Sequence, residues 1–248
     1  MMIIIQNYLL LIILKIILMK RNNIWIPHVP KNAGSTITNN TRDYCLNNKN
    51  FDVKQNIFDW QNFKYFVHIK NNNTNNQIKL DHDNPLNTDM KNWLKILIIR
   101  NPIDRFISYY NFSISLNRNM GINDNRTFDE FIETYNKYMR LEYLSHLTFL
   151  NNKQIVSTDP LIKKFTLKNI CNVIDYIVDI QNIQKIFTLI EDKFLQTKIE
   201  WKTIIPGGYS SDIFKKDYVT DNQLNKICQI PEVKKDIYFY ENIKTSFM

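Results

Sequence analysis

The chain has 248 residues, 44% of them hydrophobic and 13% aromatic, and a formal net charge of +8. This composition excludes a disordered chain, and the length suits one domain with a sizeable core. The charge favours an anionic ligand, but no DNA- or RNA-binding motif accompanies it, so we expect no nucleic-acid partner. The three cysteines show no metal-ligand spacing, so we expect no metal.

The N-terminal segment is apolar. Residues 1–19 are mostly isoleucine, leucine and methionine, and Lys20 and Arg21 follow them. A helix that spans a bilayer needs about 20 apolar residues, so we expect a membrane anchor in residues 1–20 and the functional domain in residues 21–248. A buried or interfacial helix is the alternative. Because the basic pair follows the apolar run, the positive-inside tendency favours a cytoplasmic domain, and the orientation stays open.

The first anion-binding segment follows a short apolar run. Ile24 to Val29 is rich in β-branched residues, which predicts a buried strand. It leads into Pro-Lys-Asn-Ala-Gly-Ser-Thr at residues 30–36, and we expect a helix from Gly34 to Leu46. A strand that runs into a helix N-terminus presents free backbone N–H groups and a positive dipole end, which suit a phosphate. Lys31 adds a cation to this site.

Mostly polar residues separate this segment from the next one. We expect a loop at residues 47–59, a strand over Phe63–Ile69 and a polar loop at residues 70–90. The strand carries His68 at its end. The loop that follows carries three further ionisable groups: Asp81, His82 and Asp83.

The second anion-binding segment also consists of a short apolar run that is followed by a cation and the start of a helix. Leu94–Ile99 predicts a buried strand, Arg100 follows it, and Pro102 indicates the start of a helix that we expect over residues 103–116. This junction therefore repeats the first one, with Arg100 as its cation. Two such sites suit a ligand that is phosphorylated at two ends.

The remaining elements indicate the fold class. Apolar residues at helical spacing, or short apolar runs, predict helices at residues 128–139, 141–150, 182–195 and 221–228, a strand at 175–180, and a further element at 236–240. Strands that alternate with helices predict an α/β fold with a central, mostly parallel sheet flanked by helices. Ligands of such sheets bind at the carboxyl ends of the strands, where both junctions fall.

The two junctions resemble the cofactor motifs of sulfotransferases that use 3′-phosphoadenosine 5′-phosphosulfate (PAPS). Residues 30–36, PKNAGST, are similar to the 5′-phosphosulfate loop P-K-T-x-[GS]-[ST]-[ST], and they depart from it at Asn32, where threonine is common. Residues 100–110, RNPIDRFISYY, fit the 3′-phosphate motif R-[DN]-P-x-x-R-[FL]-x-S-x-[YF] at every fixed position. The pattern is closest to the Golgi-type, membrane-anchored branch that sulfates carbohydrates.

The resemblance implies a P-loop-like, three-layer fold and metal-free sulfuryl transfer from PAPS to a hydroxyl of an anionic or neutral glycan. It implies that Lys31 neutralises the leaving oxygen, and that Arg100 and Ser108 bind the 3′-phosphate. It also implies that the rest of the first motif binds the 5′-phosphate: Asn32, Ala33, Gly34, Ser35 and Thr36. Further residues are expected where related enzymes close a loop over the adenine: Trp201, Tyr209, Ser210 and Lys215.

The reaction needs a base for the acceptor hydroxyl. This branch of the family carries a histidine after a strand between the two motifs, which makes His68 the expected catalytic base, although Val67 replaces the family's neighbouring glycine. Asp81, His82 and Asp83 are the alternatives. Arg105 is expected to pair with an acidic neighbour, and a contact with a phosphate is the alternative.

Two other functions stay open. One is a PAPS- or nucleotide-binding module without catalysis. The other is a P-loop kinase, which would need the motif G-x-x-x-x-G-K-[ST]. In this chain the lysine precedes the glycine, which disfavours the kinase.

Overall fold

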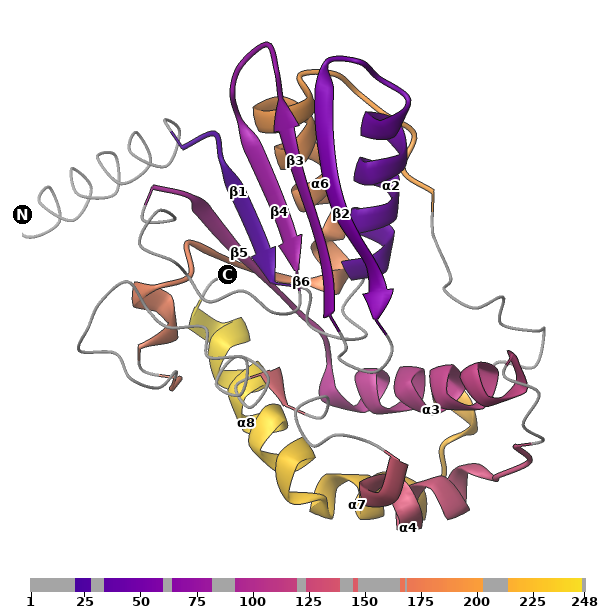
Figure 1. Ribbon diagram of the computed structural model, residues 1–248. Coiled ribbons are helices and arrows are strands. Elements are labelled where there is room, and N and C mark those ends of the chain that lie inside the picture. The colour runs from indigo at the N-terminus through magenta and orange to yellow at the C-terminus, as the bar shows by residue number, and fades with distance from the viewer. Residues whose placement is uncertain are drawn as a thin grey trace, which may run out of the picture.

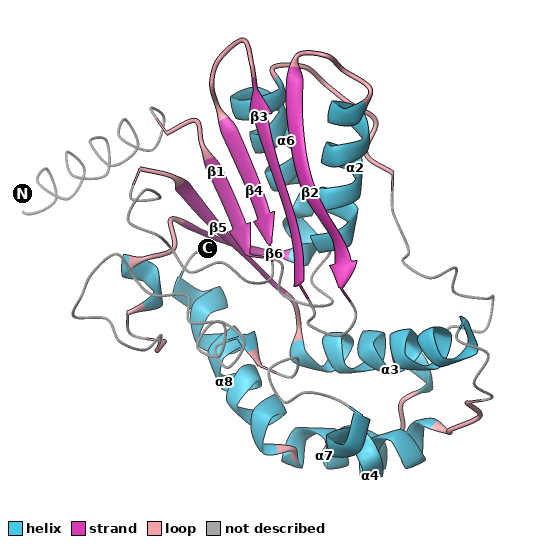
Figure 2. Cartoon of the chain, viewed as in Figure 1, coloured by secondary structure: helices cyan, strands magenta, loops and turns pink. Residues whose placement is uncertain are grey.

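The computed structural model describes residues 21–27, 34–59, 64–81, 92–119, 124–138, 145–146, 166–167, 169–202 and 214–246. Within these ranges, six strands form one sheet in the order β2-β3-β4-β1-β5-β6. The strands are β1 (Ile24–Pro27), β2 (Phe51–Asp59), β3 (Lys64–Asn71), β4 (Gln77–Asp81), β5 (Leu94–Ile99) and β6 (Tyr176–Asp179). Figures 1 and 2 show the sheet with helices around it, which confirms the α/β prediction.

The sheet is mixed. Strands β4, β1, β5 and β6 pair in parallel, while β3 runs antiparallel to both β4 and β2. Two of these strands were not expected from the sequence, because residues 47–59 and 70–90 were both assigned to polar loops. The structure corrects this assignment, since β2 lies in the first range and β4 in the second.

The helices lie where apolar spacing predicted them, with some changes in extent. The structure has α2 (Gly34–Leu46), α3 (Pro102–Asn119), α4 (Phe128–Tyr138), α6 (Ile183–Ile190), α7 (Asp221–Gln229) and α8 (Pro231–Ser246). A π-helical segment, Glu191–Leu195, continues α6, and short 3-10 segments cover Ile170–Asn172, Ile180–Asn182 and Lys216–Tyr218. The expected element at 236–240 is part of the much longer α8. The helix predicted at 141–150 lies outside the described residues except for Ser145 and His146.

The two faces of the sheet bury alternate residues of its central strands, as a pleated strand requires. On one face, Ile24, Ile26, Ile96 and Ile98 pack with buried residues of α2 and α6. On the opposite face, Trp25, Leu97 and Ile99 pack with the 3-10 segment at 170–172 and with α8. All residues of β1 and β5 are buried because helices cover both faces.

A third apolar cluster lies beyond the carboxyl ends of the parallel strands. It joins α3, α4, α7 and α8 through buried aromatic and aliphatic residues such as Phe106, Phe131, Ile227 and Val233. Figure 1 shows these helices beyond the arrowheads of β1 and β4. The cluster therefore forms a wall at the sheet edge where both sequence motifs begin.

No helix in the described part of the chain is both long and apolar enough to cross a membrane. The anchor expected in residues 1–20 lies outside the described ranges.

Candidate active site

The two sequence motifs leave neighbouring strands at the same edge of the sheet. β1 and β5 pair in parallel, with Ile24 opposite Leu94 and Trp25 opposite Lys95. From β1 the chain proceeds to β2, β3 and β4 on one side, and it then continues with β5 and β6 on the other side. The direction of the strand order therefore reverses between β1 and β5, and ligands of open α/β sheets bind at such a switch point.

The first motif joins β1 to α2. β1 ends at Pro27 and α2 begins at Gly34, so the expected strand–loop–helix arrangement is present. The loop itself, with Lys31, Asn32 and Ala33, lies outside the described residues. Gly34, Ser35 and Thr36 open a helix of 13 residues, whose first N–H groups have no partner within the helix. This N-terminus is suited to an anion.

The second motif joins β5 to α3 through a compact turn. The Asn101 side chain accepts hydrogen bonds from the backbone N–H groups of Ile103 at 3.0 Å and Asp104 at 3.3 Å. Pro102 occupies the first helical position, where its missing N–H costs nothing. Asparagine followed by proline thus fixes where α3 begins, and it places half-buried Arg100 between the strand and the helix.

A buried charged network supports this turn. Arg105, on the first turns of α3, forms an ion pair with Asp236 of α8 at 3.1 Å, which confirms the expected acidic neighbour. His146 lies beside them: its Nδ1 is 2.9 Å from both carboxylate oxygens of Asp236, and its Nε2 is 3.3 Å from the backbone nitrogen of Arg100. No pattern in the sequence indicated that His146 or Asp236 lies at this motif.

The electrostatics of the network follow from its burial. Burial lowers the pKa of His146, and the nearby charge of Arg105 lowers it further, while Asp236 opposes the shift. For Asp236 burial alone would raise the pKa, but Arg105 and the hydrogen bonds of His146 reverse that effect and lower it. The network therefore contains a carboxylate, a guanidinium and a neutral imidazole.

The segment that carries Lys215 is attached to the face of α3 that carries Ser108. Asp104, Ser108 and Asn111 lie on one stripe of the helix, since they are spaced by four and three residues. The Asn111 side chain donates to the backbone oxygen of Phe214 at 2.9 Å and accepts from its N–H at 3.0 Å, and Lys216 pairs with Asp104 at 3.0 Å. Exposed Lys215 is thereby held along the stripe that contains half-buried Ser108.

The chain segment before Phe214 is attached to α2 at Lys202. Asn40 donates to the backbone oxygen of Lys202 at 2.7 Å and accepts from its N–H at 2.9 Å. Residues 203–213, with Tyr209 and Ser210, lie outside the described residues, but both of their ends are attached to motif helices. Trp201 stacks on Phe187 with the ring centroids 4.1 Å apart and donates to Glu191 at 2.8 Å, so its ring belongs to the packing around α6.

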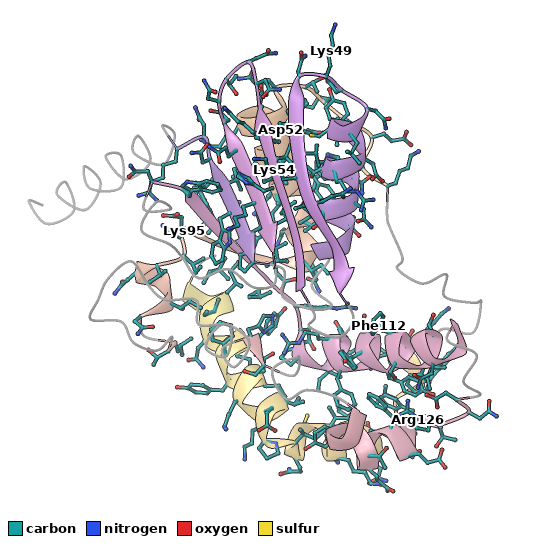
Figure 3. All side chains as sticks on the ribbon, in the orientation of Figure 1. Lys49, Asp52, Lys54, Lys95, Phe112 and Arg126 are labelled. Atoms are coloured by element: carbon teal, nitrogen blue, oxygen red, sulfur yellow. The ribbon has the colours of Figure 1, made fainter. Side chains whose placement is uncertain are left out.

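The structure does not bring His68 to this edge. β3 runs antiparallel to its neighbour β4, so the chain leads away from the edge with both motifs as it passes His68. His68 is level with Lys79, Trp25 and Lys95, five residues before Arg100, which corresponds to roughly 16 Å along the strands. Figure 3 shows Lys54, the cross-strand neighbour of His68, far from α3.

The contacts of His68 agree with this placement. Its Nε2 is 2.8 Å from the Gln77 side-chain oxygen at the start of β4, and its ring lies 6.3 Å from that of Trp93, just before β5. Both partners stand at the amino ends of parallel strands. The choice of His68 rested on the resemblance to a family that carries a histidine after a strand between the two motifs, and the antiparallel direction of β3 does not bring that residue to the edge where the motifs begin.

β4, one of the two strands that were not expected from the sequence, ends at the same edge of the sheet as β1. Asp81, the last residue of β4, is in register with Pro27, the last residue of β1. The carboxyl end of β4 therefore lies beside the beginning of the first motif loop. His82 and Asp83 follow directly in the sequence and lie outside the described residues. Alternating apolar and polar residues from Gln77 to Asp81 were the signal for this strand.

Among the described residues, no group of three or more histidine, cysteine, aspartate or glutamate side chains is arranged to hold a metal ion. Within the described ranges, the edge at the carboxyl ends of the parallel strands carries the N-terminus of α2 after β1 and Arg100 after β5. Ser108 of α3 and the nearby Lys215 add a hydroxyl and a cation. This combination can bind a doubly phosphorylated ligand across the switch point.

Comparison with known proteins agrees with the motifs. Residues 15–235 match the model of the sulfotransferase family. No curated protein and no solved structure gives a significant match. The family match covers most of the chain, including β1, β5 and all described elements from α2 to α7, so the protein belongs to the sulfotransferase family.

Proposed function

We propose that this protein transfers a sulfuryl group from PAPS to a hydroxyl group of a carbohydrate or glycoconjugate. The observation that carries the proposal is the pairing of two strand–helix junctions on adjacent parallel strands, one with a helix N-terminus and one with Arg100. The first suits the 5′-phosphosulfate and the second suits the 3′-phosphate, because a guanidinium matches the geometry of a phosphate. A P-loop-like architecture is part of the same proposal.

The transfer is an in-line displacement at sulfur. The acceptor oxygen forms a bond to sulfur while the bond from sulfur to the bridging oxygen of PAPS breaks, and 3′-phosphoadenosine 5′-phosphate (PAP) leaves with the electron pair. As in phosphoryl transfer, catalysis rests on positioning and on stabilising charge at the leaving oxygen. We assign that charge stabilisation to Lys31 and to the first N–H groups of α2.

The proton of the acceptor hydroxyl needs a base at the same edge of the sheet. We place this base at the carboxyl end of β4, at Asp81 or the adjoining His82 and Asp83, because β4 ends in register with β1. We do not assign this role to His68, since it lies level with Trp25 and Lys95, near the amino ends of β1 and β5. Loss of a general base typically costs about 10²–10⁴-fold in rate.

The glycan acceptor is supported by the family branch that the motifs resemble and by the net charge of +8, which favours an acidic acceptor. The test is transfer of labelled sulfate from PAPS to a panel of neutral and acidic glycans, with small phenols and sterols as competing acceptor classes. Transfer to a glycan supports the proposal, and transfer to the phenols or sterols alone would overturn the acceptor class.

A Lys31→Ala variant separates catalysis from binding alone. Because Lys31 is assigned to both the cofactor and the leaving oxygen, the substitution should weaken PAP binding and lower turnover further. Lys49→Ala is the matched control, since Lys49 is exposed and lies at the opposite end of the sheet in Figure 3. A chain that binds PAP but transfers sulfate to no acceptor would instead be a binding module without catalysis.

A further inference from the structure

Three buried side chains from distant parts of the sequence meet directly behind the second motif. Arg105 of α3 is 2% exposed. His146 and the Asp236 side chain, which comes from α8, are both fully buried. Asp236 accepts a hydrogen bond from the backbone N–H of His146 at 2.7 Å, and it contacts the His146 ring and the Arg105 guanidinium. One carboxylate therefore holds both the backbone N–H of His146 and the Nδ1 side of its ring.

The hydrogen bonds define the protonation of the ring. Asp236 is an acceptor, so the Nδ1 of His146 carries the hydrogen that it donates. On the opposite side of the ring, Nε2 faces the backbone N–H of Arg100 at 3.3 Å and accepts from it. A neutral imidazole satisfies both contacts, and burial favours that form.

We propose that His146 is a positioning residue for the 3′-phosphate site: held by Asp236, it accepts the N–H of Arg100 and fixes the backbone from which the Arg100 side chain extends. The inference rests on the proposed function, because the 3′-phosphate is the ligand assigned to Arg100. Asn101 fixes the next residue by capping α3. The backbone is thus held at both Arg100 and Asn101, which defines the direction in which the Arg100 side chain leaves the main chain.

The proposal predicts that a change at His146 affects binding of the 3′-phosphate selectively. The hydrogen bond of the His146 ring reaches the backbone of Arg100, which belongs to the second motif. Removing its acceptor should therefore weaken binding of the 3′-phosphate and leave binding of the 5′-phosphate unchanged. We express the effect as the selectivity ratio, which is the Kd of adenosine 5′-phosphate divided by the Kd of PAP. Loss of the hydrogen bond that holds the half-buried Arg100 backbone should lower this ratio about tenfold.

Three variants of the full chain separate positioning from general stability. His146→Gln retains an acceptor near the position of Nε2, His146→Asn retains a donor toward Asp236 but does not reach Arg100, and His146→Leu removes both. Calorimetry with PAP and with adenosine 5′-phosphate gives the ratio for each, and thermal melting without ligand reports on folding. If His146→Leu does not fold, the glutamine and asparagine variants decide the question.

We expect His146→Gln to keep the wild-type ratio to within about threefold, and His146→Asn and His146→Leu to lose about tenfold, with adenosine 5′-phosphate affinity unchanged in all three. Equal ratios in all four proteins would overturn the positioning role, as would parallel losses of both nucleotides. A wild-type chain with no preference for PAP would overturn the proposed function and this inference together. A wild-type preference that survives in every variant would overturn this inference alone.

Discussion

Removing the Asp236 carboxylate should cost a large share of the protein's stability. Asp236 is fully buried and is the ion-pair partner of Arg105 at 3.1 Å. The Nη1 and Nη2 atoms of Arg105 are buried and make no hydrogen bond of good geometry to the part of the chain that the structure describes, so within it the guanidinium depends on the carboxylate charge. Breaking a buried pair by removing one partner costs about 3–5 kcal/mol, against a total stability of about 5–15 kcal/mol for a typical domain.

Asp236→Ala should therefore lower the melting temperature by roughly 6–20 °C, since each kcal/mol shifts a domain of this size by about 2–4 °C. The assay is urea unfolding and thermal melting without ligand. Asp43→Ala is the matched control, because the Asp43 side chain is 55% exposed in its ion pair with Arg42. Such surface pairs contribute about 0–1 kcal/mol.

A double variant tests whether the cost comes from an unpaired buried charge. Arg105→Met combined with Asp236→Leu removes both charges and keeps apolar volume, so it should be more stable than Asp236→Ala alone. Two results would refute the reasoning: an Asp236→Ala cost no larger than that of Asp43→Ala, or strictly additive losses in the double variant.

Three further predictions concern the base, the pH response and the attached loop. Asp81→Asn or His82→Asn should lower sulfate transfer by about 10²-fold or more with PAP affinity unchanged, whereas His68→Asn should transfer at the wild-type rate; the opposite pattern would restore His68 as the base. Because burial lowers the pKa of His146, the unfolded chain takes up a proton below pH 6.5 that the folded chain resists, so stability should fall from pH 7 to pH 5.5. The urea midpoint should change less with pH in His146→Gln, and an equal change would show that other groups cause it. Asn111→Ala, which removes two hydrogen bonds to Phe214, should weaken PAP binding several-fold without moving the melting temperature by more than a few degrees; unchanged affinity would show that the segment at Lys215 does not reach the nucleotide.

Local patterns in the sequence predicted the parts of the fold that depend on local physics. The strand at Leu94–Ile99 and the helices at α2, α3 and α7 follow from apolar spacing and from helix-start residues such as Pro102. β4 was missed although Ile78 and Leu80 alternate with polar residues, because the surrounding asparagine-rich stretch resembled a loop. Its recognition would have required counting the period of two over only five residues.

Other parts of the site depend on pairings that no local pattern contains. The role expected for His68 depended on the direction of β3, which is set by its pairing with β4 and not by its own residues. His146 and Asp236 are separated by 90 residues, and neither belongs to a motif. Arg105 was expected to pair with an acidic residue, but only the packing of α8 on α3 identifies Asp236 as that residue.

The most direct test of the cofactor assignment is a comparison of two nucleotides on the unmodified protein. Calorimetry should show that PAP binds at least about tenfold more tightly than adenosine 5′-phosphate, because a charge-assisted contact to the 3′-phosphate contributes about 1.5–3 kcal/mol. Arg100→Ala should abolish that difference, while Arg42→Ala, which removes a solvent-facing arginine of α2, should preserve it. Equal affinity of the wild-type chain for the two nucleotides, or tightest binding of ATP with Mg²⁺, would contradict the assignment of PAPS as the sulfate donor.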